Sequence, residues 1–363
     1  MPIILHLDLD YFYAQCEMNR HPDMKGRPVV VCVYSGRTDD SGAVATCSYE
    51  ARKLGIRSGM MIVQAKRLAN EITSFLPADM DFYREISGRV MEIIENYADS
   101  FEQVSIDEAY LDVSRKCHSF EGAKLLASEI KKEIKENENL TCSIGIGWNK
   151  VTSKIAAGLQ KPDGLTLIKT EELKDKIWPL DVKELFTIGP KTKEELNKLG
   201  IRTIENLANF DMNELTNVLG ENRARQLHNF ANGVDERPVS QSLRKQISRI
   251  ATLKENTRDM EKLEKFIDYL AELLKPRLAK AKVHFKTVSI MAISTDLELH
   301  TKSETLPEQT DNIETAKNVS KKLMKEFLDE RPDAVLRRMG IRVANLVRKE
   351  EKQEQGQRKL LEF

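Results

Sequence analysis

Three carboxylates lie where predicted strands end, and their spacing suggests a metal site. The stretch "SIDEAYLDV" (residues 105–113) places Asp107 and Glu108 side by side in what otherwise reads as a buried strand. Neighbours on a strand point to opposite faces, so these two side chains converge only where the chain turns, as at a hairpin tip. Asp8 lies on the polar side of the alternating stretch "IILHLDLD" (residues 3–10). Buried charges of one sign are costly unless a partner neutralises them.

A hard divalent cation held by oxygen ligands would neutralise such carboxylates. Mg²⁺ fits best, because it takes few protein ligands and completes its octahedron with water and substrate phosphates. Each acidic pair taken alone is more often a helix cap or a solvated turn, and Asp10 could cap the helix that follows it. The position of both pairs at the ends of apolar strands favours the metal site.

The length of 363 residues exceeds what one hydrophobic core serves, so two or more domains are expected. With 40% apolar and 31% charged residues, the chain is expected to be globular and soluble. No apolar run is long enough to span a membrane, and the start "MPIILHLDLD" lacks a basic leader and a cleavage site. Five cysteines without paired metal spacing indicate thiols in a reducing cytoplasm.

The net charge is zero, but the charges are unevenly distributed along the chain. Residues 243–349 hold 23 Lys and Arg against 16 Asp and Glu, so the rest of the chain has an acidic surplus. This distribution suits a polyanion that is bound mostly by the C-terminal part. A solvated, lysine-rich surface would give the same count.

Predicted strands and helices alternate in the N-terminal half, which indicates an α+β domain. Strands are predicted at residues 3–10, 27–33, 101–106, 109–113, 141–147 and 164–168. Helices are predicted within 11–22, at 81–97, 121–137 and 150–160, and after a small-residue loop that begins at Ser41. Helical hairpins follow over about residues 170–233, then a polar linker, then an α+β part with strands at 287–295 and 337–347.

Four long blocks of the sequence resemble the signature blocks of Y-family translesion DNA polymerases, in the DNA polymerase IV-like branch common in archaea. In order, they are "DLDYFYAQCE", "SGAVATCSYEARKLGIRSGM", "SIDEAYLDV" and "NKVTSKIAAGLQKPDG". The resemblance covers nearly the whole chain and implies an α+β, multidomain, right-hand polymerase fold. The implied domains are a palm at 1–12 and 80–168, small fingers at 13–79, a helical thumb at 169–233, a linker at 234–246, a little finger at 247–349 and a tail at 350–363.

The resemblance implies a template-directed DNA polymerase that adds deoxynucleotides to a primer 3′ end with two Mg²⁺ ions. Asp8, Asp107 and Glu108 match the catalytic, metal-binding carboxylates of the family. The backbone carbonyl of Leu9 matches a further metal ligand, at a position where most relatives carry an aromatic residue. Such ions would lower the pKa of the primer 3′-hydroxyl and clamp the leaving pyrophosphate.

The resemblance also implies which residues hold the incoming nucleotide. Tyr49 and Arg52, which are three apart on a predicted helix, match binders of the β- and γ-phosphates, as does Lys161 of the "KPDG" turn. Tyr13 matches the steric gate, a ring that leaves no room for a 2′-hydroxyl. Lesser candidates are Thr46 and the backbone amides around Tyr11 and Phe12. Outside the motifs, Arg52 or Lys161 would more often be a surface charge and Tyr13 an ordinary core aromatic.

Small side chains at Ser41, Gly42 and Ala43 lie where relatives of this type cover the templating base pair. Little bulk there leaves room for a damaged base, the implied fingers are short, and no part of the chain remains for a proofreading exonuclease. We therefore expect low-fidelity synthesis and lesion bypass in DNA repair and damage tolerance.

The stretch "TIGPKTKEELNKLGI" (residues 187–201) resembles a helix-hairpin-helix motif, which binds a DNA backbone phosphate, and "LGENRARQL" (219–227) resembles a weaker copy. Thr187 stands where a first glycine is common, and either stretch could be an ordinary Gly-punctuated helix pair. Arg338 and Arg342 share one face of a predicted strand. The DNA-binding candidates are Gly189, Lys191, Gly220, Arg244, Lys245, Arg338 and Arg342.

The chain closes on "QRKLLEF", in which Gln357, Leu360 and Phe363 resemble a sliding-clamp binding box without its second aromatic residue. A frayed amphipathic end is the alternative. The expected partners are primer–template DNA, deoxynucleoside triphosphates and a sliding clamp. The protein itself is expected to be a cytoplasmic monomer that binds no membrane. A palm-type nucleotide cyclase would share the metal site, but the hairpin motifs and the basic C-terminal part favour nucleic acid. A catalytically silent DNA-binding scaffold is disfavoured by the intact carboxylates.

Overall fold

The computed structural model describes residues 1–241 and 244–348, and the chain divides into two compact units. The first unit comprises Met1–Val33 and Ala43–Gln241, and the second comprises Tyr34–Gly42 and Ser242–Phe363. The predicted fingers segment, 13–79, therefore contributes to both units. Among the described residues, no helix is long and apolar enough to cross a membrane.

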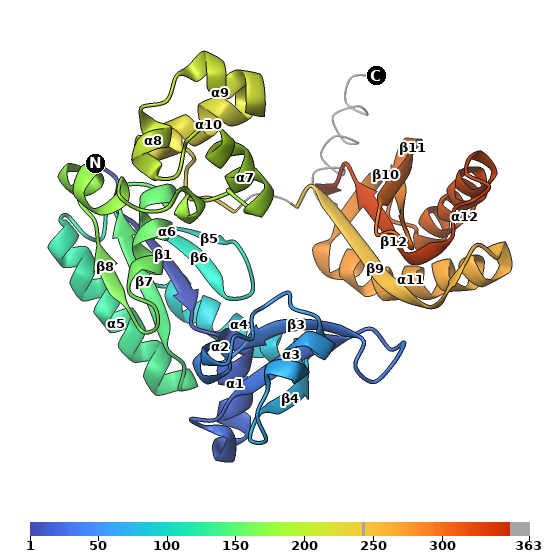
Figure 1. Cartoon of the computed structure of the whole chain (residues 1–363), viewed down its shortest axis with the longest axis horizontal. Coiled ribbons are helices and arrows are strands. Elements are labelled where there is room, and N and C mark those ends of the chain that lie inside the picture. Colours follow the sequence, from blue (N-terminus) through green and yellow to red (C-terminus); the bar gives the residue numbers. More distant parts are fainter. Residues whose placement is uncertain (242–243, 349–363) are drawn as a thin grey trace, which may run out of the picture. The chain divides into compact units, whose positions relative to one another are not determined.

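A five-stranded sheet, in the order β5-β6-β1-β7-β8, forms the centre of the first unit (Figure 1). Its strands are β1 (Ile4–Leu9), β5 (Ser100–Gln103), β6 (Glu108–Asp112), β7 (Cys142–Gly147) and β8 (Leu165–Leu167). β1 lies between β6 and β7 and runs antiparallel to both. All five strands were predicted, and this arrangement brings three distant parts of the chain side by side.

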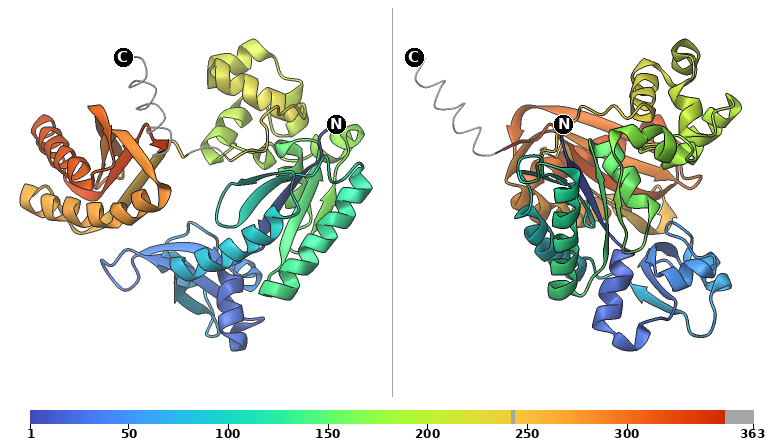
Figure 2. Two further views of the ribbon diagram at one scale, coloured as in Figure 1. Left: turned by 180° about the vertical axis from the view of Figure 1, so that it is seen from behind. Right: turned by 90° about the vertical axis from the view of Figure 1, so that its left-hand side faces the viewer.

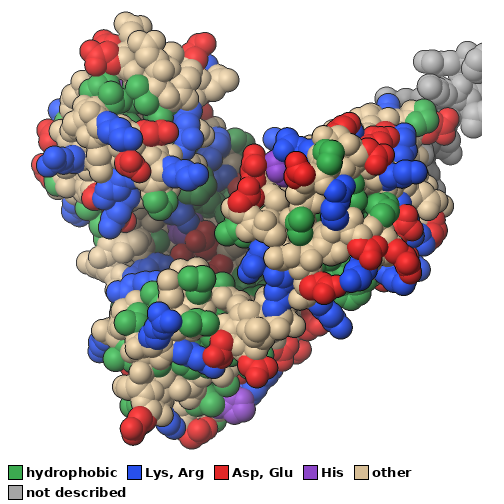
Figure 3. All heavy atoms as spheres, turned by 45° about the vertical axis from the view of Figure 1, so that its right-hand side comes forward, with side chains coloured by type: hydrophobic (Ala, Val, Ile, Leu, Met, Phe, Trp, Pro, Cys, Tyr) green, Lys and Arg blue, Asp and Glu red, His purple; other side chains and the backbone are tan. Residues whose placement is uncertain are grey.

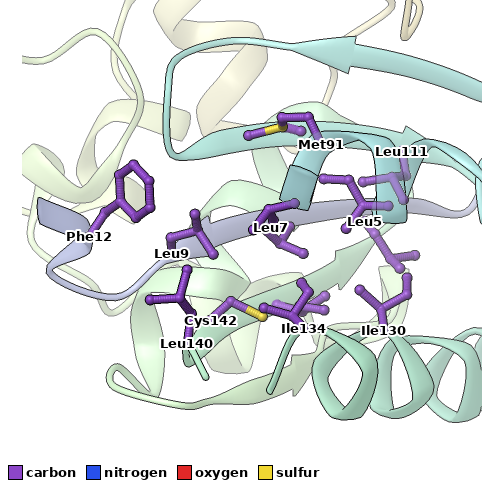
Figure 4. Close-up of a cluster of buried hydrophobic side chains, with 14 of the residues drawn as sticks. Leu5, Leu7, Leu9, Phe12, Met91, Leu111, Ile130, Ile134, Leu140 and Cys142 are labelled. Atoms are coloured by element: carbon purple, nitrogen blue, oxygen red, sulfur yellow. The ribbon is translucent and has the colours of Figure 1, made fainter. Parts of the chain in front are cut away.

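One face of this sheet is apolar and packs on two helices, α4 (Met80–Glu95) and α5 (Phe120–Glu138) (Figure 2). Leu5, Leu7 and Leu9 of β1 are fully buried in this core, close to Ile130 and Ile134 of α5 (Figure 4). The alternation predicted for β1 is therefore confirmed. Because these leucines face the core, the even-numbered side chains of β1 point to the opposite face.

A third helix, α6 (Lys150–Leu159), lies very close to β1 and β7. The close approach requires two glycines of β7. A Cβ on Gly145 would collide with the backbone of Ala157 and Ser153, and one on Gly147 would lie 2.7 Å from the backbone nitrogen of Ser153. The helix starts with a capping box between Asn149 and Thr152. The glycines thus let α6 present its side chains directly to the polar face of the sheet.

Replacing Gly145 by Ala will lower the free energy of unfolding by at least about 3 kcal/mol, because the new methyl group meets backbone atoms that cannot rotate away. Chemical denaturation measures this loss. Gly158 of α6 is the matched control, since a Cβ there meets no atom within 4 Å. Gly158→Ala should stabilise the protein by about 0.5 kcal/mol, as is usual in an open helical position. Equal effects of the two substitutions would contradict the packing argument.

The segment that connects the two parts of this sheet contains a second sheet, of order β3-β2-β4, and three helices. The elements are α1 (Phe12–Arg20), the 3₁₀ turn η1 (Pro22–Met24), β2 (Val29–Tyr34), β3 (Gly42–Cys47), α2 (Tyr49–Lys53), α3 (Ile62–Leu68) and β4 (Ser74–Pro77). The prediction of a loop after Ser41 was wrong, because β3 is a strand. Its Val44 and Cys47 are buried in a small core, so pairing and burial override the weak strand propensity of the glycine and alanines.

Helical hairpins follow, as predicted for residues 170–233. They comprise short turns at Thr170–Glu172, Leu173–Ile177 and Val182–Glu184, then α7 (Pro190–Lys198), α8 (Ile204–Ala208), α9 (Met212–Leu219) and α10 (Glu221–Ala231). Their apolar faces form a core of their own around Leu196, Leu207 and Leu227.

The second unit is built on a sheet of order β11-β10-β12-β9 with two long helices. The elements are β9 (Gln246–Thr257), α11 (Met260–Ala281), β10 (Val283–Ser294), β11 (Leu299–Thr310), α12 (Ile313–Glu330), β12 (Leu336–Ala344) and β13 (Val347–Arg348). The strands predicted at 287–295 and 337–347 are confirmed. β9 and β11 were not predicted, and in β11 only Leu306 is buried, so its sequence reads as polar.

Residues 235–240, which we call the strap, pack against the first sheet rather than forming a free linker. Val239 is buried together with Ile4 and Tyr110, and the backbone nitrogen of Ser240 donates to Glu102 at 3.1 Å. Nearer the helical hairpins, Asp235 pairs with Arg237, whose guanidinium lies 4.9 Å from the centroid of the Phe230 ring. The first half of the predicted linker, 234–246, is therefore attached to the first sheet.

Candidate active site

The three predicted carboxylates meet at one end of the first sheet. Asp8 of β1 and Glu108 of β6 are directly opposite each other in the antiparallel register. Asp107 lies in the turn that precedes β6, and its carbonyl accepts a hydrogen bond from the backbone nitrogen of Leu9 at 2.9 Å. The side chains converge because one of the two adjacent acids lies in the turn and the other in the strand, as the sequence predicted. Figure 3 shows acidic side chains with Lys and Arg side chains near them.

Two lysines neutralise this acidic group. Lys161, from the turn after α6, pairs with Asp8, and Lys154 of α6 lies 2.8 Å from Glu108. His6 of β1 lies 3.7 Å from the same oxygen of Glu108 and 3.3 Å from the nitrogen of Lys154. One turn earlier on α6, Lys150 forms a second ion pair with a strand glutamate, at 2.7 Å from Glu102. The close packing of α6 therefore places two lysines on the β5–β6 hairpin.

The pKa values reflect this crowding. Burial raises the pKa of Asp8 to about 6, Lys161 opposes that rise, and the negative charges of Glu108 and Asp107 add to it. The neighbouring His6 and the ammonium group of Lys154 hold the pKa of Glu108 well below its usual range. Burial lowers the pKa of His6 to about 4, so its ring is neutral at pH 7 and Lys154 supplies the positive charge.

The donor set suits a hard divalent cation, although the side chains do not form a ligand shell. Among residues 1–241 and 244–348, no group of three or more His, Cys, Asp or Glu side chains is arranged to hold a metal ion. Lys161 and Lys154 each pair with one of these carboxylates. Three carboxylates and the neighbouring carbonyl of Leu9 are nevertheless the oxygen ligands that Mg²⁺ prefers.

A cavity of about 280 Å³ adjoins these carboxylates. Asp8, Leu9 and Asp107 line one part of it. All seven residues predicted to hold the nucleotide also line it: Tyr11, Phe12, Tyr13, Thr46, Tyr49, Arg52 and Lys161. Glu108 does not line the cavity, and Ala45 and Ser58 line it without having been predicted.

Part of the cavity offers groups suited to an anion. Arg52 lies over the ring of Tyr49 at 4.6 Å, so the two project together from α2 as predicted. The Tyr49 ring meets the edge of Tyr11, with centroids 5.1 Å apart. Tyr11 occupies the N-cap position of α1 with φ 35°, and its side chain accepts no capping hydrogen bond, so the first amides of α1 remain available to a ligand. Acidic side chains and groups suited to an anion thus share one cavity.

Comparisons with known proteins identify the family of the chain. Residues 7–158 match the impB/mucB/samB family model, residues 244–359 match the C-terminal domain of that family, and residues 183–235 match the thumb domain of DNA polymerase-iota. The chain is 41% identical over 368 residues to DNA polymerase IV 1 of Methanosarcina mazei, covering 99% of each chain. It belongs to the Y family of DNA polymerases.

Solved structures of this family agree with the fold of the polymerase. A Y-family chimera of Dbh and Dpo4 is 36% identical, with a TM-score of 0.87 over 96% of this chain and 100% of that one. An insertion ternary complex of Dbh DNA polymerase is also 36% identical, with a TM-score of 0.72 and the same coverage. The chain is thus a DNA-directed DNA polymerase of the translesion type, dependent on divalent metal ions, with the palm, fingers, thumb and little-finger architecture. The matches do not support the nucleotide cyclase or the silent scaffold.

The predicted steric gate of the polymerase rests on a second tyrosine that the sequence did not single out. The ring of Tyr13 stacks on that of Tyr83, with centroids 4.4 Å apart and planes 11° apart. Tyr83 is fully buried, and its hydroxyl donates to the buried carboxylate of Glu17 at 2.6 Å. No spacing signal could reveal Tyr83, because it is one apolar residue of the amphipathic helix α4. The stack holds Tyr13 at the surface of the cavity.

The predicted DNA-facing residues of the thumb lie at helix starts. Gly189 precedes α7 and Lys191 is exposed in its first turn, while Gly220, with φ 77°, joins α9 to α10. Thr187 adopts φ 77°, so it makes the turn usually given to glycine. Each of the two stretches therefore has a residue with positive φ at or near the turn that precedes a helix.

The remaining predicted residues are distributed over several elements. Ser41 and Gly42 belong to the second unit and Ala43 to the first, and all three are half-buried. Arg338 and Arg342 share one face of β12, alternating with the buried Met339, Ile341 and Val343. Arg244 and Lys245 are exposed ahead of β9. Gln357, Leu360 and Phe363 lie outside the described residues.

Proposed function

We propose that the polymerase adds deoxynucleotides by two-metal chemistry in the cavity beside Asp8 and Asp107. The observation that supports this proposal is that carboxylates and anion-binding groups line the same cavity of about 280 Å³. Two bound Mg²⁺ ions would supply Lewis acidity, which lowers the pKa of the primer 3′-hydroxyl and neutralises the leaving pyrophosphate.

In this proposal Asp8, Asp107, Glu108 and the carbonyl of Leu9 hold the metal ions. Arg52 binds the β- and γ-phosphates as a fork and Lys161 binds them as a point charge, with Tyr49 and the amides of Tyr11 and Phe12 beside them. Thr46 lies at the same site. The protein contributes positioning and charge neutralisation, which is what phosphoryl transfer requires.

Lys161 would have one anionic partner without substrate and another with substrate bound. Lys161 is paired with Asp8 in the structure and is itself proposed to bind the triphosphate. With Asp8 holding a metal ion, Lys161 would lose this partner and would donate instead to the triphosphate. Lys161 would thereby have an anionic partner in both states.

We propose further that the polymerase acts as a cytoplasmic monomer on primer–template DNA. Gly189, Lys191 and Gly220 of the thumb would contact backbone phosphates through amides and an ammonium group. Arg244, Lys245, Arg338 and Arg342 would lie along the duplex, which predicts binding that weakens steeply with salt. Ser41, Gly42 and Ala43 would cover the templating base with little bulk.

Primer extension tests the central proposal. Extension should require Mg²⁺, stop with EDTA, and continue past an abasic site. A Mn²⁺ titration of the complex with primer–template and nucleotide, followed by electron paramagnetic resonance, should give two bound ions per chain. One bound ion in active complex would contradict the two-metal proposal, and arrest at the abasic site as complete as that of a replicative enzyme would contradict the tolerant template cover.

A tail deletion tests the proposed clamp partner. Removing residues 356–363 should abolish stimulation by a sliding clamp, because Gln357, Leu360 and Phe363 are the proposed contacts. Extension without the clamp should stay unchanged, since these residues belong to no catalytic group. Clamp stimulation that survives the deletion would refute the role of the tail.

A further inference from the structure

Asp10 is a fully buried carboxylate that no proposed role accounts for. It follows β1, two residues after Asp8, yet it does not line the nucleotide cavity. The sequence suggested a helix cap, and that reading was wrong, because the N-cap of α1 is Tyr11 and no side chain accepts from the first turn. A buried carboxylate is stable only where donors are directed at it. Its two donors indicate its role.

Both side-chain oxygens of Asp10 accept hydrogen bonds from distant segments. One oxygen accepts from the hydroxyl of Ser143 on β7 at 2.8 Å, and the other accepts from the backbone nitrogen of Asp163 at 2.8 Å. The Ser143 oxygen in turn accepts from the backbone nitrogen of Gly164 at 3.3 Å. Asp10 and Ser143 thus bind two successive backbone amides of the turn that follows α6.

The same turn carries Lys161. Lys131 of α5 also holds this turn, because it donates to the side chain of Asp163 at 2.6 Å and to the carbonyl of Cys142 at 2.7 Å. Gly164 lies so close to the end of α6 that a Cβ there would collide with the carbonyl of Gln160. The turn is therefore held from β1, β7 and α5. Only the side chain of Lys161 is directed at the cavity.

We propose that Asp10 is a positioning residue for the incoming nucleotide, which holds the turn of residues 161–164 so that Lys161 reaches the triphosphate. This proposal rests on the proposed phosphate-binding role of Lys161. Asp10 itself touches neither the substrate nor the metal ions. Its carboxylate is suited to the task because it is an acceptor at both oxygens, and the turn presents only donors to it.

Asparagine at position 10 tests this geometry with almost no change of shape. Its amide group directs N–H bonds where a carboxylate oxygen accepted one, so at least one donor loses its partner and the turn shifts. Single-turnover insertion of one nucleotide separates the dissociation constant of the nucleotide from the insertion rate. Asp10→Asn should raise the dissociation constant about tenfold and change the insertion rate by less than about threefold. The affinity for primer–template DNA should not change.

Asp112 provides the matched control. It also accepts from a serine hydroxyl and a backbone nitrogen, both of Ser114, but it lies at the other end of β6. Asp112→Asn should leave the nucleotide dissociation constant unchanged. Ser143→Ala, which removes the bridge to Gly164, should raise it in the same direction as Asp10→Asn.

A double-mutant cycle distinguishes the positioning role of Asp10 from the phosphate-binding role of Lys161, on which it rests. Lys161→Ala alone should weaken nucleotide binding, and if it does not, the phosphate role of Lys161 fails. If it does, Asp10→Asn should add little in the Lys161→Ala background, because both act through one ammonium group. The positioning role would be overturned if the losses of nucleotide affinity in Asp10→Asn and Lys161→Ala were fully multiplicative. It would also be overturned if the dissociation constant were unchanged in both Asp10→Asn and Ser143→Ala, or if Asp112→Asn had an effect equal to that of Asp10→Asn.

Discussion

Asp8→Asn polymerase will insert nucleotides at least about a thousandfold more slowly than the unaltered protein. Asp8 is the carboxylate that lies opposite Glu108 in the sheet and lines the nucleotide cavity, and it is proposed to hold metal ions. An amide there keeps the shape but removes the charge that a divalent cation requires. Single-turnover insertion with saturating DNA measures the rate, and binding of primer–template DNA should remain normal.

The same substitution should stabilise the fold at pH 7 in EDTA. Burial raises the pKa of Asp8 from 3.8 to about 6, so the folded state holds this proton more tightly than the unfolded state does. The contribution of Asp8 to stability therefore falls as pH rises through that window, and above it the charged form opposes folding. Asn at this position carries no such charge. Thermal unfolding at pH 4 and pH 7 should show the pH-dependent loss in the unaltered protein and a smaller loss in the variant.

Asp112→Asn serves as the control for this experiment as well, since Asp112 lies at the far end of β6 from the cavity. It should retain full activity and gain no stability. An Asp8→Asn protein that inserts nucleotides at a normal rate would refute the assignment of Asp8. An inactive but less stable Asp8→Asn protein would contradict the electrostatic account while leaving the catalytic one.

Tyr13→Ala will lower the preference for deoxyribonucleotides over ribonucleotides by at least about a hundredfold. The Tyr13 ring lines the cavity, and its stack on Tyr83 prevents it from moving aside to admit a 2′-hydroxyl. Removing the ring opens that space without touching the carboxylates. The ratio of insertion efficiencies for the two sugars measures the change, and insertion of deoxyribonucleotides should persist.

Tyr97→Ala controls for the loss of an aromatic side chain elsewhere, because Tyr97 contacts Glu133 of α5 and does not line the cavity. It should lower stability and leave sugar discrimination unchanged. Tyr83→Phe gives a second comparison, since it keeps the stacked ring and removes only the hydrogen bond to Glu17. Discrimination that is unaffected by Tyr13→Ala would refute the steric gate.

Sequence reasoning predicted the parts of the fold whose local pattern is strong. The alternation in β1 and the acidic pair at the β5–β6 turn are visible in the residues themselves, and both occur in the structure. β11 was missed because charged and polar residues fill most of it and only Leu306 is buried. β3 was missed because glycine and alanine give a weak strand signal and the strand forms through its partner β2.

The contacts that organise the site could not be predicted from local pattern. Asp10 binds Ser143 and Asp163, which lie more than a hundred residues further along the chain. Tyr13 meets Tyr83 in the same long-range way. A single sequence shows which residue types are present, but it does not show which distant segments meet. The resemblance supplied the residues that line the cavity, whereas the residues that hold them in place became visible only in the structure.

The strap fixes the point from which the chain leaves the first unit of the polymerase. Val239 and Ser240 anchor the chain to Ile4, Tyr110 and Glu102, so this point lies on the catalytic sheet and not on the thumb hairpins. A movement of the thumb hairpins would therefore leave this anchor point on the sheet in place. A C-terminal domain from a related enzyme could then be joined after residue 241 without affecting the thumb. This junction is therefore a suitable point for recombination between related enzymes.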